Sequence, residues 1–582
     1  MADYKENYKH WLDSVKAEEK AELLALSGED KELQERFTLP LAFGTAGMRG
    51  VLGLGTFRMN EYTVARATQG LADYIREQGA DAMKRGVVIS YDTRRMSYEF
   101  AMKAARVLAA NEVNAYLFEN VRPVPICSFA VGYLGTFSGI MITASHNPKE
   151  YNGYKVYGSD GAQLSPEATA RVVSYIEKRD YFGIPEAAID PSRENVMGKD
   201  KEKLCDYITV MGRSVDEAYF ERIGKLSLSP EAVAKEGGDL KIVYTPLHGS
   251  GYKPVTEILS RMHIPYNVVP EQAKPDPEFP TVKMPNPEMP DALTLGIKLA
   301  EELGSDVVIG TDPDADRMGV AVRNDKGVFV LLTGNQTGVL LMDYILRRHK
   351  ERGTLPANAA VVKTIVTTSL AEKVAASYGA TCYDVLTGFK FIGEKIDLFA
   401  RTGAHTFLFG YEESYGYLAG THAKDKDAVV STMLFAEMVC YYKSIGVSLY
   451  ERLQEIYRAL GYYAEQTISV YFKGLDGMAI MANKTKALRG VDIREIAGYK
   501  VASVVDFLAG EKTDLASGKK EKIDFPKSDV MKYFLEGGDW VAIRPSGTEP
   551  KLKLYVSASA DSAEKAAEKA KTLLENMKGY VE

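Results

Sequence analysis

The sequence predicts an α/β protein of four domains, in which three related α/β domains with mixed sheets precede an α+β C-terminal domain. The chain has 582 residues, more than one hydrophobic core usually serves, so several domains are expected. Short apolar runs that end in polar loops recur in pairs along the first three blocks. Alternating apolar and polar residues mark the last block, as in sheets with one exposed face.

Each of the first three blocks has the order strand, helix, strand. The strands precede polar loops, and an open α/β sheet holds its ligands just past the carboxyl ends of its strands. The paired segments are GVVISYDTRR (86–95) and GIMITASHNP (139–148), LKIVYTPLHGSGY (240–252) and DVVIGTDPDADR (306–317), and AAVVKTIVTTS (359–369) and HTFLFGYEESYG (405–416).

The last block has a different pattern. The alternating runs EQTISVYF (465–472) and KLKLYVSAS (551–559) predict half-buried strands, and residues 562–577 form a helical pattern that can cover them. We therefore expect domain boundaries near residues 205, 325 and 462. The predicted domains are residues 1–205, 206–325, 326–462 and 463–582.

The composition excludes several classes of partner. A net charge of -7 gives no general attraction to nucleic acid or anionic membrane, so neither is expected as a partner. Four cysteines without a CxxC pair favour reduced thiols. The charged start lacks an apolar signal region, and no stretch of about 18 apolar residues follows. We expect a cytoplasmic protein without a membrane span.

Three aspartates, Asp312, Asp314 and Asp316, alternate directly after an apolar run in GTDPDADRMG (310–319). A loop at a strand end can direct all three carboxylates to one point, where they would repel one another. A divalent cation with a preference for oxygen ligands removes that repulsion, so the pattern predicts an Mg²⁺ site. A solvated acidic turn is the alternative.

An EF-hand begins with the same alternation of aspartates, but it does not fit this segment. Arg317 stands where that loop requires glycine, and Arg323 stands where it requires a bidentate acid. Arg317 instead favours a phosphoryl ligand, whose charge it can neutralise beside the metal.

Ser145 follows another apolar run, in TASHNPKEYNGYK (143–155). A serine hydroxyl is a poor nucleophile without a base or metal to activate it, and a Ser-His pair alone does not make a triad. Taken singly, Ser145 is equally well explained as the cap of a loop. The other loops favour a phosphoryl acceptor, and Lys155 is close enough in sequence to reach a phosphoryl group on Ser145.

Two further loops carry groups that can bind phosphate and sugar. IRPSGTEPK (543–551) combines a guanidinium, hydroxyls and a glycine-opened backbone, which suit a dianion. FGYEESYGY (409–417) places Glu412 and Ser414 after a strand, where a carboxylate can accept hydrogen bonds from sugar hydroxyls; a surface turn is the alternative. Neighbouring segments add Lys390, Lys424 and Lys426, each of which alone is usually solvated surface.

Taken in order, these loops resemble the motifs of the α-D-phosphohexomutase superfamily, the phosphoglucomutases and phosphomannomutases. Their form is most similar to a bacterial phosphoglucomutase branch related to the eukaryotic phosphoglucomutase/phosphopentomutase type. The resemblance implies four domains around a central active-site cleft. The matching segments span nearly the whole chain: FGTAGMRG (43–50), TASHNPKEYNGYK, TDPDADR (311–317), TGFKFIGEK (387–395), GYEES (410–414) and RPSGTEPK (544–551).

The resemblance implies a cytoplasmic, Mg²⁺-dependent phosphoglucomutase, an intramolecular phosphotransferase of the isomerase class that interconverts glucose 1-phosphate and glucose 6-phosphate. In the family the active serine, here Ser145, is a phosphoserine that passes its phosphoryl group to the sugar monophosphate. The resulting glucose 1,6-bisphosphate turns over and returns its other phosphate to the serine. The expected partner is therefore a small-molecule sugar phosphate, and we expect a monomer or weak dimer.

The superfamily's residue roles carry over onto the matching positions. Mg²⁺ would be held by Ser145 together with Asp312, Asp314 and Asp316. Arg317 and Lys155 would neutralise the transferring group, and either His146 or Lys390 would move the proton of the sugar hydroxyl. The expected substrate-binding residues are Arg49, Thr387, Gly388, Glu412, Ser414, Lys424, Lys426, Arg544, Ser546, Gly547 and Thr548.

One departure from the family pattern concerns specificity. Many relatives have glycine directly before the Glu-Glu-Ser run, whereas Tyr411 stands here between Gly410 and Glu412. Phosphopentomutase and phosphomannomutase therefore stay open, and pentose and hexose differ by one CH₂OH, which changes discrimination by only about 1–3 kcal/mol. A phosphoserine hydrolase is a further alternative. A non-catalytic scaffold paralogue is disfavoured, because the serine and all three aspartates are retained.

Overall fold

The structure is a computed structural model that describes residues 3–44, 47–472, 476–546 and 550–582. The chain forms two compact units. Unit 1 contains residues 1–332, 393–398 and 415–446, and unit 2 contains residues 333–392, 399–414 and 447–582. The four domain boundaries stay predictions.

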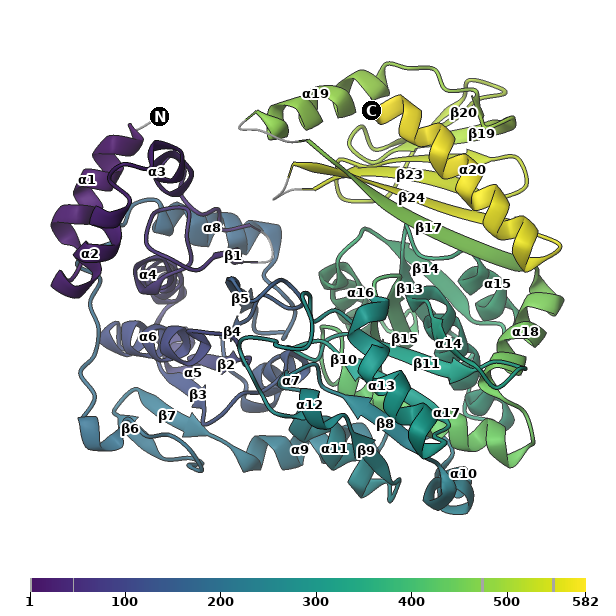
Figure 1. Cartoon of the computed structure of the whole chain (residues 1–582), viewed down its shortest axis with the longest axis horizontal. Helices are drawn as coiled ribbons and strands as arrows, with labels where there is room; N and C mark the ends of the chain where they lie inside the picture. Colours follow the sequence, from purple (N-terminus) through teal and green to yellow (C-terminus); the bar gives the residue numbers. More distant parts are fainter. Residues whose placement is uncertain (1–2, 45–46, 473–475, 547–549) are drawn as a thin grey trace. The chain divides into compact units, whose positions relative to one another are not determined.

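A seven-stranded mixed sheet organises the first part of unit 1 (Figure 1). In spatial order its strands are β1 (Met48–Val51), β5 (Tyr151–Tyr157), β4 (Ser138–Ile142), β2 (Val87–Tyr91), β3 (Ala115–Phe118), β7 (Ile208–Met211) and β6 (Lys203–Cys205). β2 pairs in parallel with β3 and β4, whereas β5 pairs antiparallel with β4 and β1. Every residue of β2 and β4 is buried, as expected of strands covered on both faces.

Helices cover this sheet, and three further helices form the N-terminal end of the described chain. The three N-terminal helices pack around Trp11 and Phe37, neither of which is exposed. The helices of this part are α1 (Tyr4–Ser14), α2 (Ala17–Ala25), α3 (Asp30–Phe37), α4 (Glu61–Glu77), α5 (Ala80–Arg85), α6 (Ser97–Ala110), α7 (Val124–Leu134), α8 (Pro166–Ile176) and α9 (Arg213–Gly224).

A five-stranded mixed sheet follows in unit 1. Its strands in spatial order are β12 (Phe329–Leu332), β11 (Met318–Arg323), β10 (Val307–Thr311), β8 (Ile242–Thr245) and β9 (Tyr266–Val268). β8 pairs in parallel with β9 and β10, and β10 pairs antiparallel with β11. The remaining elements of unit 1 are α10 (Pro230–Glu236), α11 (Tyr252–Arg261), α12 (Pro270–Ala273), α13 (Pro290–Leu303), β16 (Gly416–Ala419) and α17 (Ala428–Ser444).

Unit 2 begins with a parallel arrangement. Strand β13 pairs in parallel with both β14 and β15, so that it lies between them. The elements are α14 (Gly334–Glu351), β13 (Ala359–Thr364), α15 (Leu370–Ser377), β14 (Thr381–Val385), α16 (Phe389–Thr402), β15 (Thr406–Glu412) and α18 (Leu449–Leu460). Residues 393–398 of α16 are assigned to unit 1.

The C-terminal part of unit 2 is an antiparallel sheet that carries α20 across its face (Figure 1). Its strands are β17 (Tyr462–Tyr471), β24 (Lys551–Ala560), β23 (Trp540–Pro545), β22 (Met531–Leu535), β19 (Tyr499–Asp506), β20 (Glu511–Asp514), β21 (Lys520–Lys522) and, beside β19, β18 (Glu495–Ile496). The helices are α19 (Gly477–Arg489) and α20 (Ala563–Val581). The predicted fold class, three α/β parts followed by an α+β C-terminal domain, is confirmed.

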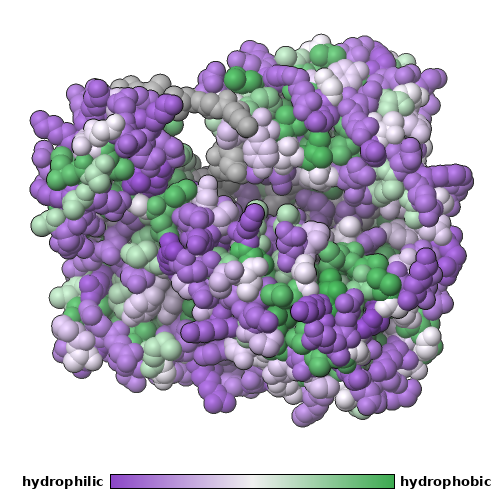
Figure 2. Space-filling model, in the orientation of Figure 1, coloured by the Kyte–Doolittle hydropathy of each residue, from purple (hydrophilic) through white to green (hydrophobic). Residues whose placement is uncertain are grey.

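Hydrophilic residues predominate on the face shown in Figure 2, with hydrophobic residues in separate patches. Among the described residues, no helix combines the length and apolar character needed to cross a membrane.

One cation, Lys532 on β22, lies inside the core of unit 2 and is 3% exposed. Its Nζ donates a hydrogen bond to the carbonyl oxygen of Ile365 at 2.6 Å and lies 4.1 Å from the ring centroid of Trp540. Burial disfavours the charged amine and lowers the pKa of Lys532 to about 7.

This burial predicts a pH-dependent stability. The unfolded chain keeps the Lys532 proton up to a pKa near 10.5, whereas the folded chain releases it near 7, so stability should rise with pH across this window. Relative to Lys532→Met, we expect the wild-type free energy of unfolding to increase between pH 7 and pH 9 by up to about 1.4 kcal/mol per pH unit. Urea unfolding at several pH values measures it. Equal pH slopes for the two proteins would contradict the prediction, and Lys512→Met, at an exposed position on β20, is the control.

Candidate active site

Ser145 lies in the loop between β4 and β5, where the backbone of unit 1 turns sharply. Its φ of 52° is in the left-handed region, which a non-glycine residue rarely adopts. The backbone N–H of Ser145 donates a hydrogen bond to Thr143 Oγ1 at 2.8 Å and helps to hold this turn. The side chain is thereby directed inward, and the residue is 3% exposed.

The hydroxyl of Ser145 lies at the three aspartates. Its Oγ donates a hydrogen bond to Asp312 Oδ2 at 2.9 Å and lies 3.2 Å from His146 Nδ1. The predicted meeting of the serine loop with the acidic loop is therefore present within unit 1, although the two are separated by 167 positions in the sequence.

The acidic loop joins β10 to β11 and buries all three aspartates. Asp312, Asp314 and Asp316 each offer a carboxylate oxygen, and these atoms lie within 4.8 Å of one another. The backbone N–H groups of Asp316 and Arg317 donate hydrogen bonds to Asp312 Oδ1, which bends the loop around that carboxylate. Ala315 has a φ of 45° at the bend.

The aspartate cluster fits a hard divalent cation. Asp314 Oδ1 and Asp316 Oδ1 are buried without a hydrogen-bond partner in the described part of the chain, and a buried carboxylate oxygen left so is costly. Burial and the carboxylates of Asp314 and Asp316 raise the pKa of Asp312 well above its ordinary value. An oxygen-preferring cation such as Mg²⁺ would relieve both penalties.

Two lysines neutralise part of this negative charge. Lys155 Nζ, on β5, lies 2.9 Å from Asp314 Oδ2 and 3.6 Å from Asp316 Oδ2. Burial alone would raise the pKa of Asp314, but the charges of Lys155 and Lys426 and the hydrogen bonds of Asp312 and Lys155 together hold it below its ordinary value. Lys426 Nζ lies 3.0 Å from Asp316 Oδ2.

Lys424, predicted beside Lys426 as a substrate ligand, has a different partner. Its Nζ forms an ion pair with Asp397 at 2.6 Å, so that it is turned toward α16 rather than toward the aspartate cluster. The intervening Asp425 accepts hydrogen bonds from Tyr157 and Lys426 and holds this loop against β5.

Three further predicted residues border the serine in unit 1. Arg49 donates a hydrogen bond to Asn147 Oδ1 at 3.0 Å in the serine loop, and Arg317 pairs with Glu288. Desolvation and the charges of Arg317 and Arg49 hold the pKa of His146 well below its ordinary value. His146 is therefore neutral near pH 7, because these groups disfavour its protonated form.

The other predicted residues belong to unit 2, except those outside the described residues. Gly388, with a φ of 117°, precedes α16, which carries Lys390 in its first turn, and Thr387 lies beside it. Glu412 ends β15 and is 9% exposed, and Ser414 follows it. Arg544 and Ser546 lie at the end of β23 and just after it. Gly547 and Thr548 lie outside the described residues.

The departure at Tyr411 has a structural explanation. Tyr411 is 1% exposed, and a Cβ added to Gly338 on α14 would come within 2.3 Å of its ring. The ring therefore fills the space that this glycine leaves on α14, and Glu412 follows it at the strand end. The extra tyrosine is part of the core.

Sequence reasoning missed several residues that shape the site. Glu413 accepts a hydrogen bond from Thr364 Oγ1 at 2.9 Å, whereas only its neighbours Glu412 and Ser414 were predicted as ligands. Thr143 donates one to Asp314 Oδ2 at 3.1 Å. Arg94, in the loop after β2, donates hydrogen bonds to the serine loop. The only available signal for Arg94 was its place just past the end of a predicted strand.

Models of one protein family match most of the chain. Four models of the phosphoglucomutase/phosphomannomutase family match in order: alpha/beta/alpha domain I at residues 40–182, domain II at 217–327, domain III at 333–460 and the C-terminal domain at 481–574. The chain belongs to this family. The resemblance inferred from the motifs is thus confirmed.

Individual relatives of this phosphoglucomutase/phosphomannomutase family member cover nearly the whole chain. A protein named phosphoglucomutase from Staphylococcus epidermidis is 40% identical over 542 residues, 93% of this chain and 94% of that protein. One of the same name from Staphylococcus aureus is 37% identical over 549 residues, 94% of each chain. The crystal structure of a putative phosphomannomutase from Thermus thermophilus has the same fold, with a TM-score of 0.66 at 24% identity, covering 93% of this chain and 99% of that one.

The acidic cluster predicts a measurable metal affinity. Asp314→Asn removes one carboxylate charge while keeping the side chain's shape, so we expect it to weaken Mg²⁺ binding by about tenfold or more. Isothermal titration of the protein with Mg²⁺, without sugar, measures this. Asp325→Asn, in the exposed turn between β11 and β12, is the matched control and should bind Mg²⁺ like the wild type. Unchanged affinity in Asp314→Asn would exclude this cluster as the metal site.

Proposed function

We propose that the protein is a phosphoglucomutase that interconverts glucose 1-phosphate and glucose 6-phosphate through a phosphoserine enzyme and glucose 1,6-bisphosphate. The observation that carries the proposal is the hydrogen bond from Ser145 Oγ to Asp312 Oδ2 at 2.9 Å, inside a buried cluster of three aspartates. Relatives named phosphoglucomutase at 40% and 37% identity support the glucose assignment.

The chemistry assigned to the chain is transfer of one phosphoryl group between two hydroxyls. The bond between phosphorus and Ser145 Oγ breaks as a bond to a sugar oxygen forms, and the sugar hydroxyl gives up its proton. Phosphoryl transfer depends mainly on alignment and on neutralising the charge of the group. A Mg²⁺ ion bound by Asp312, Asp314 and Asp316 would supply part of that charge.

Residues of the chain supply the remaining positive charge and carry the proton. Lys155, and with it Arg317, brings positive charge to the transferring group. His146 Nδ1 lies 3.2 Å from Ser145 Oγ, which supports His146 as the group that carries the proton; Lys390 is the alternative. Burial of Ser145 protects its phosphate from water, which argues against a phosphoserine hydrolase.

Unit 2 carries predicted ligands of the sugar ring and of the phosphate that is not reacting. Glu412 and Ser414 would bind the ring hydroxyls, and Arg544 with Ser546 would bind the phosphate that is not reacting. Thr387, Gly388, Lys424, Lys426 and Arg49 are proposed as further substrate ligands. A cytoplasmic enzyme that acts as a monomer or weak dimer is part of the same proposal.

Replacement of the proposed phosphoryl acceptor is the first test. Ser145→Ala should lower the rate of glucose 1-phosphate conversion by roughly 10³-fold or more, because it removes the hydroxyl that is proposed to carry the phosphoryl group. A coupled assay of glucose 6-phosphate formation measures the rate, and intact mass spectrometry should detect one phosphoryl group on the wild type and none on the variant. Ser192→Ala, at an exposed serine, is the control. Near-normal turnover in Ser145→Ala would refute the phosphoserine mechanism.

Assays of ribose 5-phosphate and mannose 6-phosphate formation compare the alternative substrates with glucose 1-phosphate. A kcat/KM for ribose 1-phosphate or mannose 1-phosphate above that for glucose 1-phosphate would replace the glucose assignment by phosphopentomutase or phosphomannomutase.

The phosphate ligand in unit 2 predicts a binding defect. Arg544 would hold the spectator phosphate, so Arg544→Ala should raise KM for glucose 1-phosphate by about 10- to 100-fold with a smaller change in kcat. Steady-state kinetics of this variant and of Arg494→Ala, an exposed arginine of the same part of the chain, make the comparison. An unchanged KM in Arg544→Ala would contradict the assignment.

A further inference from the structure

Arg94 lies in the loop after β2, and its side chain is entirely buried behind the serine loop. Its Nη2 donates hydrogen bonds to the carbonyl oxygens of Ser145 and Asn147, each at 2.5 Å. Its Nη1 donates to the carbonyl oxygens of Pro148 at 2.9 Å and Tyr151 at 3.0 Å. All four N–H groups of the terminal nitrogens are therefore committed to the backbone of one loop.

This pattern requires a guanidinium. The planar fork presents two nitrogens in fixed directions and can reach four carbonyl oxygens at once, whereas the ammonium of lysine offers three donors from a single atom. The carbonyl groups of the serine loop point inward toward Arg94 because the chain reverses at Ser145, where φ is 52°. Without the fork the carbonyl oxygens of Ser145 and Asn147 would lose these hydrogen bonds, and the strained turn would lose the support of Arg94.

The charge of Arg94 is balanced locally. Asp92 Oδ2 lies 3.3 Å from Arg94 Nε, and Asp92 Oδ1 accepts hydrogen bonds from the backbone N–H of Arg94 and from Ser97 Oγ. Asp92 is itself 1% exposed. Arg94 and Asp92 thus form a buried ion pair with no net charge behind the serine loop.

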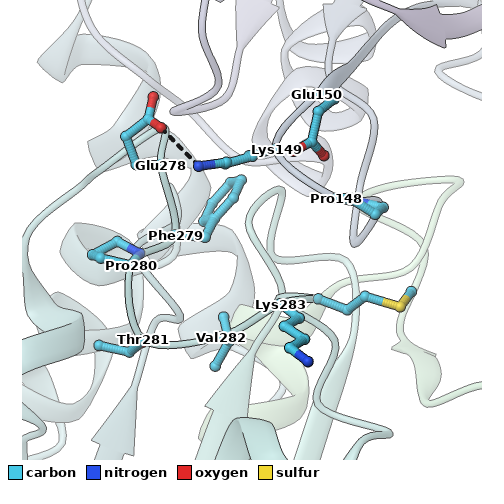
Figure 3. A pocket seen from close by; sticks show the side chains of 10 residues that line it. Pro148, Lys149, Glu150, Glu278, Phe279, Pro280, Thr281, Val282 and Lys283 are labelled. Carbon is cyan, nitrogen blue, oxygen red and sulfur yellow. Dashed lines mark hydrogen bonds and ion pairs between the residues drawn. The ribbon is translucent and has the colours of Figure 1, made fainter.

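A loop from the Pro-rich segment 274–290 covers the guanidinium. The ring centroid of Phe279 lies 5.0 Å from the Arg94 guanidinium carbon, and Phe279 is 2% exposed with a φ of 44°. Beside it, Glu278 pairs with Lys149 of the serine loop at 3.1 Å (Figure 3). Glu278 also pairs with Arg95. A cavity of about 570 Å³ lies between the far end of the serine loop and residues 278–284. Phe279 thus packs against Arg94, on the inner side of the serine loop. The outer side of the serine loop borders the cavity.

We propose that Arg94 is a positioning residue for phosphoryl transfer, which sets the place of Ser145 Oγ at the aspartates, and that Phe279 holds Arg94 in that position. The side chain of Arg94 contacts the loop backbone and leaves the serine hydroxyl to Asp312. Loss of the fork should therefore affect the chemical step more than sugar binding. The kinetic part rests on the proposed phosphoglucomutase activity, and the structural part does not.

Arg94→Lys is the central test, because it keeps the charge opposite Asp92 and removes the fork. We expect kcat to fall about 100-fold with KM for glucose 1-phosphate changed less than about threefold, since displacements near 1 Å can cost that much in rate. Arg85→Lys is the matched control: Arg85 also donates to two backbone carbonyl groups, those of Gly135 and Thr136, but in another loop. It should keep kcat within about threefold of the wild type.

Chemical rescue separates positioning from a general loss of stability. In Arg94→Ala, millimolar guanidinium should restore part of kcat, whereas ammonium at the same ionic strength should not, because only guanidinium reproduces the planar donors. Phe279→Leu keeps an apolar side chain without the ring and should lower kcat by a smaller factor than Arg94→Lys does. This variant tests the proposal if Arg94→Ala does not fold.

Amide hydrogen exchange provides a readout that needs no substrate. In Arg94→Lys, amides of residues 144–151 should exchange faster than in the wild type, while those of the sheet core should not change. A kcat of Arg94→Lys equal to that of Arg85→Lys, or unchanged exchange in residues 144–151, would overturn the proposal. If the wild type is inactive on glucose phosphates, the proposed function fails, and the exchange result still decides whether Arg94 positions the loop.

Discussion

The burial of three carboxylates within 4.8 Å of one another is the constraint on which the candidate site depends. Such a cluster is unstable by itself, because each negative charge is removed from water and faces two others. Lys155 from β5 and Lys426 from the loop before α17 form ion pairs with these aspartates and neutralise part of their charge. Segments far apart in the chain are thereby drawn to one point, and that point is where Ser145 presents its hydroxyl. The same excess of negative charge that would destabilise the core makes the position suitable for a divalent cation.

The fold class and the centre of the site could be predicted because both leave local patterns. Buried strands are short and apolar, and the residues just past their carboxyl ends face a common edge of the sheet. Ser145 follows β4, and the aspartates follow β10, so each was found from its own strand. Lys155 was predicted because it follows Ser145 closely in the sequence, and the structure places it on β5, which pairs with β4.

Contacts between distant segments could not be predicted in the same way. Arg94 bonds to carbonyl groups more than 50 positions away, and a backbone carbonyl has no sequence signature. Lys424 and Lys426 are two positions apart and were treated alike, yet one pairs with Asp397 and the other with Asp316. In an extended strand, residues two positions apart face the same side, so the spacing of these lysines does not predict that they bind different partners. Tyr411 looked like a specificity feature, whereas it fills space beside Gly338.

The left-handed backbone at Ser145 limits which amino acids can serve there. Threonine offers the same hydroxyl chemistry, but its branched β-carbon crowds the neighbouring carbonyl when φ is positive. Glycine would relax the turn and bring no oxygen at all. The choice of the smallest hydroxylated side chain is thus imposed by the shape of the main chain, and any engineered exchange of the acceptor atom would have to begin with the backbone.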